Sequence, residues 1–413
     1  MAVHSGYHSA MSGLRITMLA PFGIRPKGTL SARMLPLAQA LARRDHCVSI
    51  IAPPVQNPQD AGRRDIYDGV PVTHTPLPAW PGPAGVAQQV QSLLRAALAE
   101  QPDLLHLFKP KGYSGLAALL LRAVRPNLPL VVDTDDWEGW GGWNDLLPYP
   151  LPAKLLFAWQ ERDLPRRAAA VTAASRTLQA QVWGFGVPPA KVFYVPNGIS
   201  SLELKVKSSK LNRSVTQNSE LRTLNLLLYT RFWEFELRDL VVALVPVVAS
   251  CPAARLLVVG RGERGEEREL LRLAGRAGIA AAIDYRGWAE PDQIPALLAA
   301  ADLALVPMDD TLINRARSLA KLLELMAAGL PIVAGRVGQV AEYIEDGRSG
   351  LLVAPGDPAA LARAALALLA NPTLREQLGQ GARARVAQHY TWDRLAPDAE
   401  AAYQLARRSR PPA

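Results

Sequence analysis

Lys321 and Glu324 carry the most informative chemistry in the sequence, because they stand three residues apart near the start of a predicted helix. Ser318 precedes them and is predicted to cap this helix by accepting hydrogen bonds from the free amides near Lys321. Free amides, the positive end of the helix dipole and the lysine ammonium together attract an anion. Glu324, on the same helix face, could accept hydrogen bonds from ribose hydroxyls. The pattern favours a nucleoside diphosphate site; the competing interpretation is an ion pair on an ordinary surface helix.

Two further features of the second half of the chain could contact such a ligand. Arg231 ends a predicted strand, and its guanidinium can donate parallel hydrogen bonds to phosphate oxygens, unless it is a surface arginine. Gly260, Gly262 and Gly265 match the G-x-G-x-x-G fingerprint of dinucleotide-binding enzymes. That fingerprint usually follows the first strand of its domain, whereas here it follows the second. The plain interpretation of Gly262 is a tight turn that needs glycine, and an NAD-dependent oxidoreductase stays a less favoured alternative.

The first half of the chain has polar side chains after two predicted strands. Lys109 could face phosphates or an acidic acceptor, or be solvated. Asp135 and Asp136 could accept hydrogen bonds from sugar hydroxyls, orient an attacking hydroxyl or bind a hard cation, if they are not simply a solvated loop. Trp137 could stack on a sugar, sit at a lipid interface or pack as part of a lid. His106, at the end of the earlier strand, is either a site residue or a buried core histidine.

The composition is that of a globular protein. With 413 residues, 49% hydrophobic and 20% charged, the chain is long enough for two or three domains. No apolar run approaches the roughly 20 residues of a membrane span, and the first thirteen residues lack the pattern of a secretory signal. The two cysteines give no disulfide framework and no metal-ligand spacing. We therefore expect a cytoplasmic protein.

The net charge of +9 comes from basic residues that are scattered and interleaved with acids. This pattern is typical of a solvated surface, and the sequence has no nucleic-acid-binding signature. We therefore expect no nucleic acid partner, whereas peripheral association with the inner face of the membrane stays open.

Predicted strands and helices alternate in two sets along the chain. This alternation predicts an α/β fold of two Rossmann-like, doubly wound domains that face a central cleft. The predicted strands are 14–20, 48–52, 104–107, 130–133, 170–173 and 192–195 in the first set and 224–229, 254–259, 283–285, 303–306 and 332–334 in the second. The predicted bounds are 1–199 for the first domain, 200–223 for a polar linker, 224–388 for the second domain, and 389–413 for a C-terminal helix with a mobile tail.

The motif S-x-x-K-x-x-E-x-M-A-x-G-x-P, from Ser318 to Pro331, resembles the donor-binding segment of family 4 glycosyltransferases. These enzymes have the GT-B fold and use nucleotide sugars. Arg231 matches the arginine that the family places against the diphosphate, and Gly28 matches its glycine-rich turn near the donor sugar. The segment 196–198, Pro-Asn-Gly, also occurs in the expected order, so the resemblance covers nearly the whole chain.

The resemblance implies a retaining glycosyltransferase of hexosyltransferase type, which moves a sugar from a nucleoside diphosphate to a hydroxyl acceptor without a metal or cofactor. The acceptor would be a glycan, a lipid-linked sugar or a small molecule. The last helix would cross back to the first domain. The roles that it implies are catalytic for Arg231, Lys321, Asp135 and His106, donor-binding for Gly28, Arg231, Gly262, Ser318, Lys321 and Glu324, and acceptor-side for Lys109, Asp135, Asp136 and Trp137.

Three positions depart from the family pattern. Phe108 stands where a second histidine is usual, Ala316 replaces the first carboxylate of the EX7E motif, and Glu236 replaces a lysine that follows Arg231. Asp309 or Asp310 could supply the missing carboxylate from the same loop. These departures leave a non-catalytic nucleotide-sugar-binding protein as the alternative function.

Overall fold

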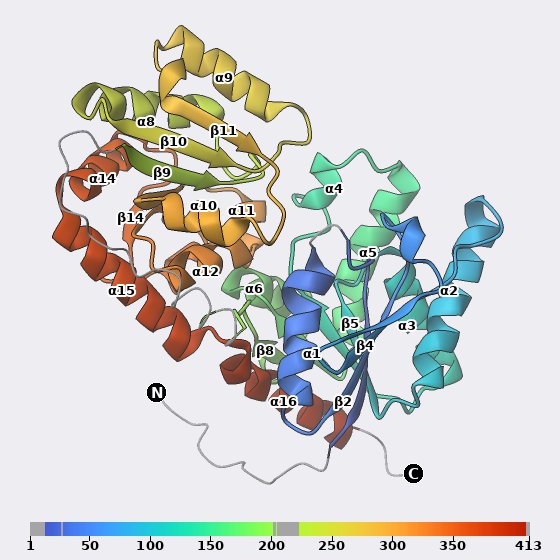
Figure 1. Ribbon diagram of the computed structural model, residues 1–413. Helices are drawn as coiled ribbons and strands as arrows, with labels where there is room; N and C mark the ends of the chain where they lie inside the picture. The colour runs from blue at the N-terminus through green and yellow to red at the C-terminus, as the bar shows by residue number, and fades with distance from the viewer. Residues whose placement is uncertain (1–12, 26–27, 201–203, 205–222, 410–413) are drawn as a thin grey trace. The chain divides into compact units, whose positions relative to one another are not determined.

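The computed structural model describes residues 13–25, 28–200, 204 and 223–409 (Figure 1). The predicted linker at 200–223 and the predicted mobile tail lie largely outside the described residues. The chain divides into two compact units. The first unit holds the described parts of Met1–Ala173, Gln179–Val195 and Ala396–Ala413, and the second holds Ala174–Leu178 and the described parts of Pro196–Leu395.

The first unit is built on an eight-stranded sheet with the order β3-β4-β2-β1-β5-β6-β7-β8. Its neighbouring strands pair in parallel, except for the antiparallel pair β3 and β4. The central strands β5 and β6 are mostly apolar and buried at every position, as expected where helices cover both faces of a parallel sheet. The strands are β1 (Arg15–Leu19), β2 (Cys47–Ala52), β3 (Arg64–Tyr67), β4 (Val70–His74), β5 (Leu104–Phe108), β6 (Leu130–Thr134), β7 (Ala170–Ala173) and β8 (Val192–Tyr194).

The helices of the first unit follow these strands along the chain. They are the π-helix η1 (Leu30–Met34), α1 (Leu35–Ala42), the 3-10 turn η2 (Pro58–Asp60), α2 (Gly82–Ala99), α3 (Gly112–Val124), α4 (Trp143–Leu146), α5 (Leu151–Arg167) and the 3-10 turn η3 (Pro189–Lys191). Two further helices, α6 (Arg176–Gly184) and α16 (Trp392–Arg408), have residues in both units. In the described part of the chain, no helix is both long and apolar enough to cross a bilayer.

The second unit is built on a six-stranded parallel sheet with the order β11-β10-β9-β12-β13-β14. Counted within the unit, this is the Rossmann order 3-2-1-4-5-6, which reverses direction between β9 and β12. Ligands of such sheets bind at the carboxyl ends of the strands beside that reversal. The strands are β9 (Leu224–Tyr229), β10 (Ala254–Val259), β11 (Ile283–Gly287), β12 (Leu303–Val306), β13 (Ile332–Gly335) and β14 (Leu351–Val353).

The second unit has its helices on both faces of the sheet (Figure 1). They are α8 (Leu237–Ser250), α9 (Glu266–Arg276), the 3-10 turn η4 (Ala280–Ala282), α10 (Ile294–Ala300), α11 (Leu312–Ala316), α12 (Ala320–Ala327), α13 (Val340–Tyr343), α14 (Pro358–Ala370) and α15 (Pro372–His389).

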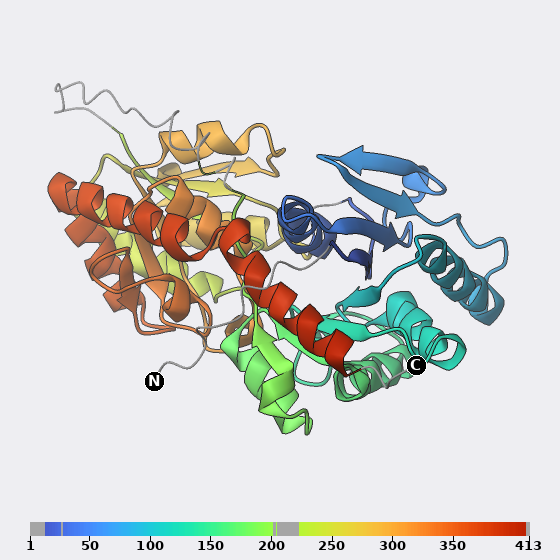
Figure 2. The same cartoon turned by 90° about the horizontal axis from the view of Figure 1, so that it is seen from below.

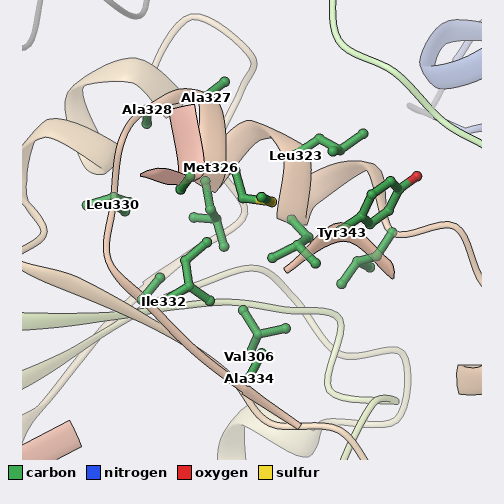
Figure 3. Close-up of a cluster of buried hydrophobic side chains, with 14 of the residues drawn as sticks. Val306, Leu323, Met326, Ala327, Ala328, Leu330, Ile332, Ala334 and Tyr343 are labelled. Atoms are coloured by element: carbon green, nitrogen blue, oxygen red, sulfur yellow. The ribbon is translucent and has the colours of Figure 1, made fainter. Parts of the chain in front are cut away.

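A buried cluster on one face of this sheet fixes helix α12. Leu323 and Met326 of α12 pack in the same core cluster as Val306 and Ile332 from the strands (Figure 3). Lys321 and Glu324 lie on the part of α12 that is only partly buried. The apolar residues of this short helix therefore hold it against the sheet, and Lys321 and Glu324 stay partly exposed to solvent.

The predicted α/β fold is confirmed, but three strands were missed. Strands β3 and β4 form a hairpin at the edge of the first sheet (Figure 2), joined by Asp68 and Gly69, both with positive φ. Asp-Gly between alternating apolar residues is a hairpin signature, so the sequence did hold a signal for this pair. Strand β14 is a three-residue edge strand, too short to give a periodic pattern.

Candidate active site

Two partly buried cationic side chains of the second unit form no hydrogen bond and no ion pair with any described residue. Arg231 follows β9, and Lys321 lies in the first turn of α12; neither forms a hydrogen bond or an ion pair with a described residue. The Lys321 Nζ atom lies 4.3 Å from the centroid of the Tyr229 ring, which it faces as a cation–π contact. Both side chains are only partly exposed. The prediction that Arg231 and Lys321 occupy one site therefore agrees with this geometry.

The electrostatics of Lys321 identify the groups around it. Burial lowers the pKa of the Lys321 ammonium to about 8, and the neighbouring charges of Arg231 and Arg317 act in the same direction. The carboxylates of Glu234 and Glu324 oppose this shift. The site therefore gathers three cationic groups and two carboxylates at the reversal of strand order, where a ligand is expected.

Glu234 and Arg317 lie beside Lys321, and the sequence reasoning named neither of them. Glu234 is 5% exposed; its Oε2 atom accepts hydrogen bonds from the Thr230 hydroxyl at 3.0 Å and the Trp233 amide at 2.9 Å. Its Oε1 atom lies 3.3 Å from Nη1 of Arg317. Although burial acts to raise it, Arg317 and Lys321 lower the pKa of the Glu234 carboxyl.

The predicted role of Ser318 as a helix cap is wrong. Helix α12 begins at Ala320, Leu319 occupies its N-cap position, and no side chain caps it. The Ser318 hydroxyl instead accepts a hydrogen bond from the Asn197 amide at 2.9 Å and lies 2.7 Å from the Tyr343 hydroxyl. Ser318 is thus committed to tertiary structure, and the uncapped end of α12 keeps its positive dipole beside Lys321.

Two amides of the glycine-rich turn after β10 donate to carboxylates at the start of helix α9. The Gly262 amide donates to Glu267 at 3.2 Å, and the Arg264 amide donates to Glu266 at 2.7 Å. A Cβ atom at Gly260 would lie 1.8 Å from the Thr230 carbonyl oxygen, so close packing explains this glycine. The Gly262 amide is therefore already used within the turn, and a donor contact at Gly262 stays a prediction.

Asp309 and Asp310 are not seen at the cationic cluster. The Asp309 carboxylate accepts from the Glu236 backbone amide, and burial raises its pKa. Asp310 forms an exposed ion pair with Arg315. The buried carboxylate beside the cations is Glu234 instead.

In the first unit, His106 is a core histidine, which contradicts its predicted catalytic role. Its side chain is fully buried, with Nδ1 at 2.9 Å from the Tyr403 hydroxyl and Nε2 at 3.2 Å from the Thr172 hydroxyl. Burial lowers the pKa of the imidazole to about 3, although the Asp133 carboxylate opposes the shift. Since both ring nitrogens are occupied and shielded from solvent, His106 has no atom left to take a proton from a substrate.

Thr172 links this histidine to a buried ion pair that sequence reasoning also missed. The Asp133 carboxylate accepts from Thr172 at 2.5 Å and from the Arg33 guanidinium at 2.8 and 2.6 Å. Arg33 is 1% exposed and Asp133 is fully buried, so this pair is internal to the fold. Nothing near it in sequence marks Arg33, which lies 100 residues before its partner.

Lys109 and the acidic loop after β6 do come together. The Lys109 ammonium lies 2.7 Å from Asp136, 3.0 Å from Glu138 and 3.7 Å from Asp135. Lys111 also forms an ion pair with Glu138. Both lysines are buried, at 7% and 5% exposed, so neither is the solvated loop lysine considered from the sequence. Their ammonium groups are neutralised internally and are not available to a phosphate.

One oxygen of Asp135 makes no hydrogen bond with a described residue, although the Lys109 ammonium lies 3.7 Å from it. Its Oδ2 atom accepts from the Thr29 hydroxyl at 2.7 Å, whereas the buried Oδ1 atom has no hydrogen-bond partner in the described part of the chain. Burial raises the pKa of this carboxyl to about 6, although Lys109 opposes the shift. In the described ranges, no group of three or more His, Cys, Asp or Glu side chains is arranged to hold a metal ion.

The remaining predicted positions of the first unit are Trp137 and Gly28. The Trp137 indole N–H donates to the Trp140 carbonyl at 2.8 Å, which leaves only its partly exposed ring for stacking. The Gly28 amide donates to the Ser31 hydroxyl at 3.1 Å in an exposed turn before η1.

Comparisons with known proteins agree with this architecture. The model described as "Glycosyl transferase 4-like domain" matches residues 28–198, and the one described as "Glycosyl transferases group 1" matches residues 224–371. A phosphatidyl-myo-inositol mannosyltransferase of Mycobacterium leprae is 27% identical over 406 residues, covering 95% of this chain and 96% of that protein.

Solved structures share the fold. Sucrose-phosphate synthase from Thermosynechococcus elongatus superposes with a TM-score of 0.72 at 20% identity, covering 95% of this chain and 98% of that one. The Anabaena protein HepE, in complex with UDP and glucose, gives a TM-score of 0.66 at 19% identity over 95% and 99% of the two chains. The chain belongs to the group 1, GT4-like glycosyltransferases, which use nucleotide sugars, and it has the GT-B fold.

Proposed function

We propose that this enzyme transfers a hexosyl group from a nucleoside diphosphate sugar to a hydroxyl acceptor, with retention of the anomeric configuration. The observation that carries the proposal is the pair of partly buried cations, Arg231 and Lys321, which form no hydrogen bond or ion pair with a described residue, with Glu324 close to Lys321. A buried charge without a partner is costly, so it is retained where a ligand supplies the partner. The mannosyltransferase relative and the UDP complex of HepE support a hexosyl donor of this kind.

In this reaction the two cations stabilise the leaving group, the nucleoside diphosphate. As the bond between the sugar C1 and the β-phosphate oxygen breaks, negative charge grows on the diphosphate, and Arg231 and Lys321 stabilise it more than they stabilise the intact donor. The acceptor oxygen bonds to C1 on the same face, and its proton passes to the departing phosphate oxygen. Glu324 accepts hydrogen bonds from the ribose hydroxyls of the nucleotide.

We assign acceptor recognition to the acidic loop of the first unit. Asp135 has a buried oxygen without a hydrogen-bond donor, and Asp136 is the more exposed carboxylate beside it. Both can accept from hydroxyl groups of an acceptor, and the Trp137 ring can stack on its apolar face. This assignment places no catalytic role on His106.

A panel of nucleoside diphosphates tests the donor site. UDP, GDP or ADP should raise the thermal unfolding midpoint of the wild type, and the matching nucleotide sugar should be transferred or slowly hydrolysed. Lys321→Ala should lower kcat by about 10²- to 10³-fold with the fold intact, as for removal of one oxyanion-stabilising group. Arg336→Ala, which removes an exposed arginine paired with Asp346 in the same unit, is the control.

The outcomes separate the alternatives. A shift by UDP or GDP without transfer or hydrolysis of any of the corresponding sugars would favour a binding protein that has lost catalysis. The absence of a shift by every nucleoside diphosphate would refute the donor site itself.

A further inference from the structure

We infer that Arg317 is a third phosphate-binding cation of this site, which takes the place of the lysine that the chain lacks at Glu236, and that Glu234 is the positioning residue that holds it. The inference deepens the proposed function, because it assumes a nucleoside diphosphate at Arg231 and Lys321.

Arg317 lies in the short segment that leads into helix α12, which carries Lys321. It lies between the end of α11 at Ala316 and the start of α12 at Ala320, directly before the buried Ser318. Its charge lowers the pKa of Lys321, which shows that the guanidinium is close to that ammonium. Two cations are therefore brought near each other by neighbouring segments of the chain, at a cost that a bound polyanion would remove.

The hydrogen bonding of Arg317 is incomplete for a structural arginine. Its side chain is only 14% exposed, yet it makes one contact, from Nη1 to Glu234 at 3.3 Å. A guanidinium has five N–H donors, so most of them have no partner in the described residues. Arg33, by contrast, donates from two nitrogens to both oxygens of Asp133.

Glu234 is arranged to orient Arg317 without occupying its remaining donors. The Oε2 atom of Glu234 is held by Thr230 and by the Trp233 amide, which leaves Oε1 for Arg317. One fixed oxygen can anchor one end of a guanidinium while the other end stays available for two parallel bonds to phosphate oxygens. The cluster then has three cations against two carboxylates, an excess of positive charge that favours an anionic ligand.

Calorimetric titration of the full-length protein with UDP, UMP, GDP and GMP tests this role. For the base that the wild type binds, Arg317→Ala should weaken diphosphate binding by about tenfold or more and monophosphate binding by less, because the second phosphate is the assigned contact. Arg317→Lys should recover part of the loss. Arg315→Ala is the matched control, since Arg315 lies two residues away and its exposed guanidinium already pairs with Asp310.

A structural role for Arg317 predicts a different pattern. Equal weakening of the diphosphate and the monophosphate, or an Arg317→Ala affinity equal to that of Arg315→Ala, would overturn the inference while leaving the donor site standing. If Arg317→Ala does not fold, the same titrations are made with Arg317→Lys and with Glu234→Gln. If both variants keep the wild-type ratio of diphosphate to monophosphate affinity, the inference is overturned. A wild type that binds none of the four nucleotides would refute the proposed function and this inference together.

Discussion

Each unit buries a lysine near the point where its strand order reverses, but the two lysines are treated in opposite ways. Lys109 follows β5 in the first unit, and three carboxylates surround its ammonium within 3.7 Å. Lys321 in the second unit faces the Tyr229 ring and has no hydrogen bond or ion pair with a described residue. Burial acts to lower both pKa values; the carboxylates reverse the shift for Lys109, whereas that of Lys321 falls to about 8. The comparison teaches that a buried cation becomes evidence for a ligand only when the protein leaves it unpaired.

The backbone is similar in the two places. Lys109 has φ +49° and Phe232 has φ +67°, and each follows a strand that borders the reversal, β5 or β9. Left-handed backbone at a non-glycine residue costs energy and persists where surrounding contacts fix it. Here the Lys109 amide donates to the Asp133 carbonyl at 2.9 Å, and the Phe232 amide donates to the Thr230 hydroxyl at 2.7 Å. Both units thus bend the chain sharply after a strand that borders the reversal, although β5 and β9 lie on opposite sides of the reversal in their own sheets.

The largest expected effect is on the paired lysine. Lys109→Met should lower the free energy of unfolding by about 3 to 5 kcal/mol, because it leaves Asp135 and Asp136 close together without their cation, whereas Glu138 keeps Lys111. Urea denaturation of the variant and the wild type measures this loss. The double variant Lys109→Met/Asp136→Asn should recover part of it, since one of the stranded carboxylates is removed. A loss below about 1 kcal/mol would show that the cluster is solvated instead of internally paired.

The same contrast explains what the sequence could and could not predict. Arg231, Lys321 and Glu324 could be named as candidates from the sequence because a strand end and a helical spacing place their backbones without any tertiary information. The partners of Lys109 follow the next strand along the chain, yet the sequence did not show that the lysine would be buried among them. Pairing of this kind depends on side-chain directions that no local pattern encodes.

The errors have the same origin over longer distances. Glu234 and Arg317 are 83 residues apart, and His106 is 297 residues from the Tyr403 hydroxyl that fills its hydrogen-bonding capacity. Ser318 has the residue type of a helix cap, but Asn197 and Tyr343 compete successfully for its hydroxyl. Local propensity decided which elements form, and tertiary contacts decided which polar atoms were left for a ligand.

Replacing the other lysine, Lys321, should change the free energy of unfolding in the opposite direction. A folded-state pKa near 8, below the ordinary value for lysine, means that folding disfavours the charged form of Lys321. Lys321→Met should therefore stabilise the ligand-free protein near neutral pH, by roughly 1 to 3 kcal/mol. The gain should shrink as the pH rises above about 8, because the wild-type lysine then folds uncharged. Urea denaturation of both proteins near pH 7 and near pH 9.5 measures this; a destabilised variant would mean that Lys321 has an internal partner.

The smallest expected effect is on the pH dependence of nucleoside diphosphate binding, which should differ between variants of the two lysines. If the ammonium of Lys321 contacts the diphosphate, affinity for the bound nucleoside diphosphate should fall as Lys321 loses its proton, by at most about tenfold for each pH unit above 8. Lys321→Arg should flatten this dependence, since a guanidinium stays charged throughout that range. Lys109→Arg should leave it unchanged, because three carboxylates hold the pKa of Lys109 well above its ordinary value. Titration calorimetry across this range distinguishes the two lysines, and a wild-type affinity that does not change between about pH 7 and pH 10 would mean that the unpaired lysine does not bind the phosphates.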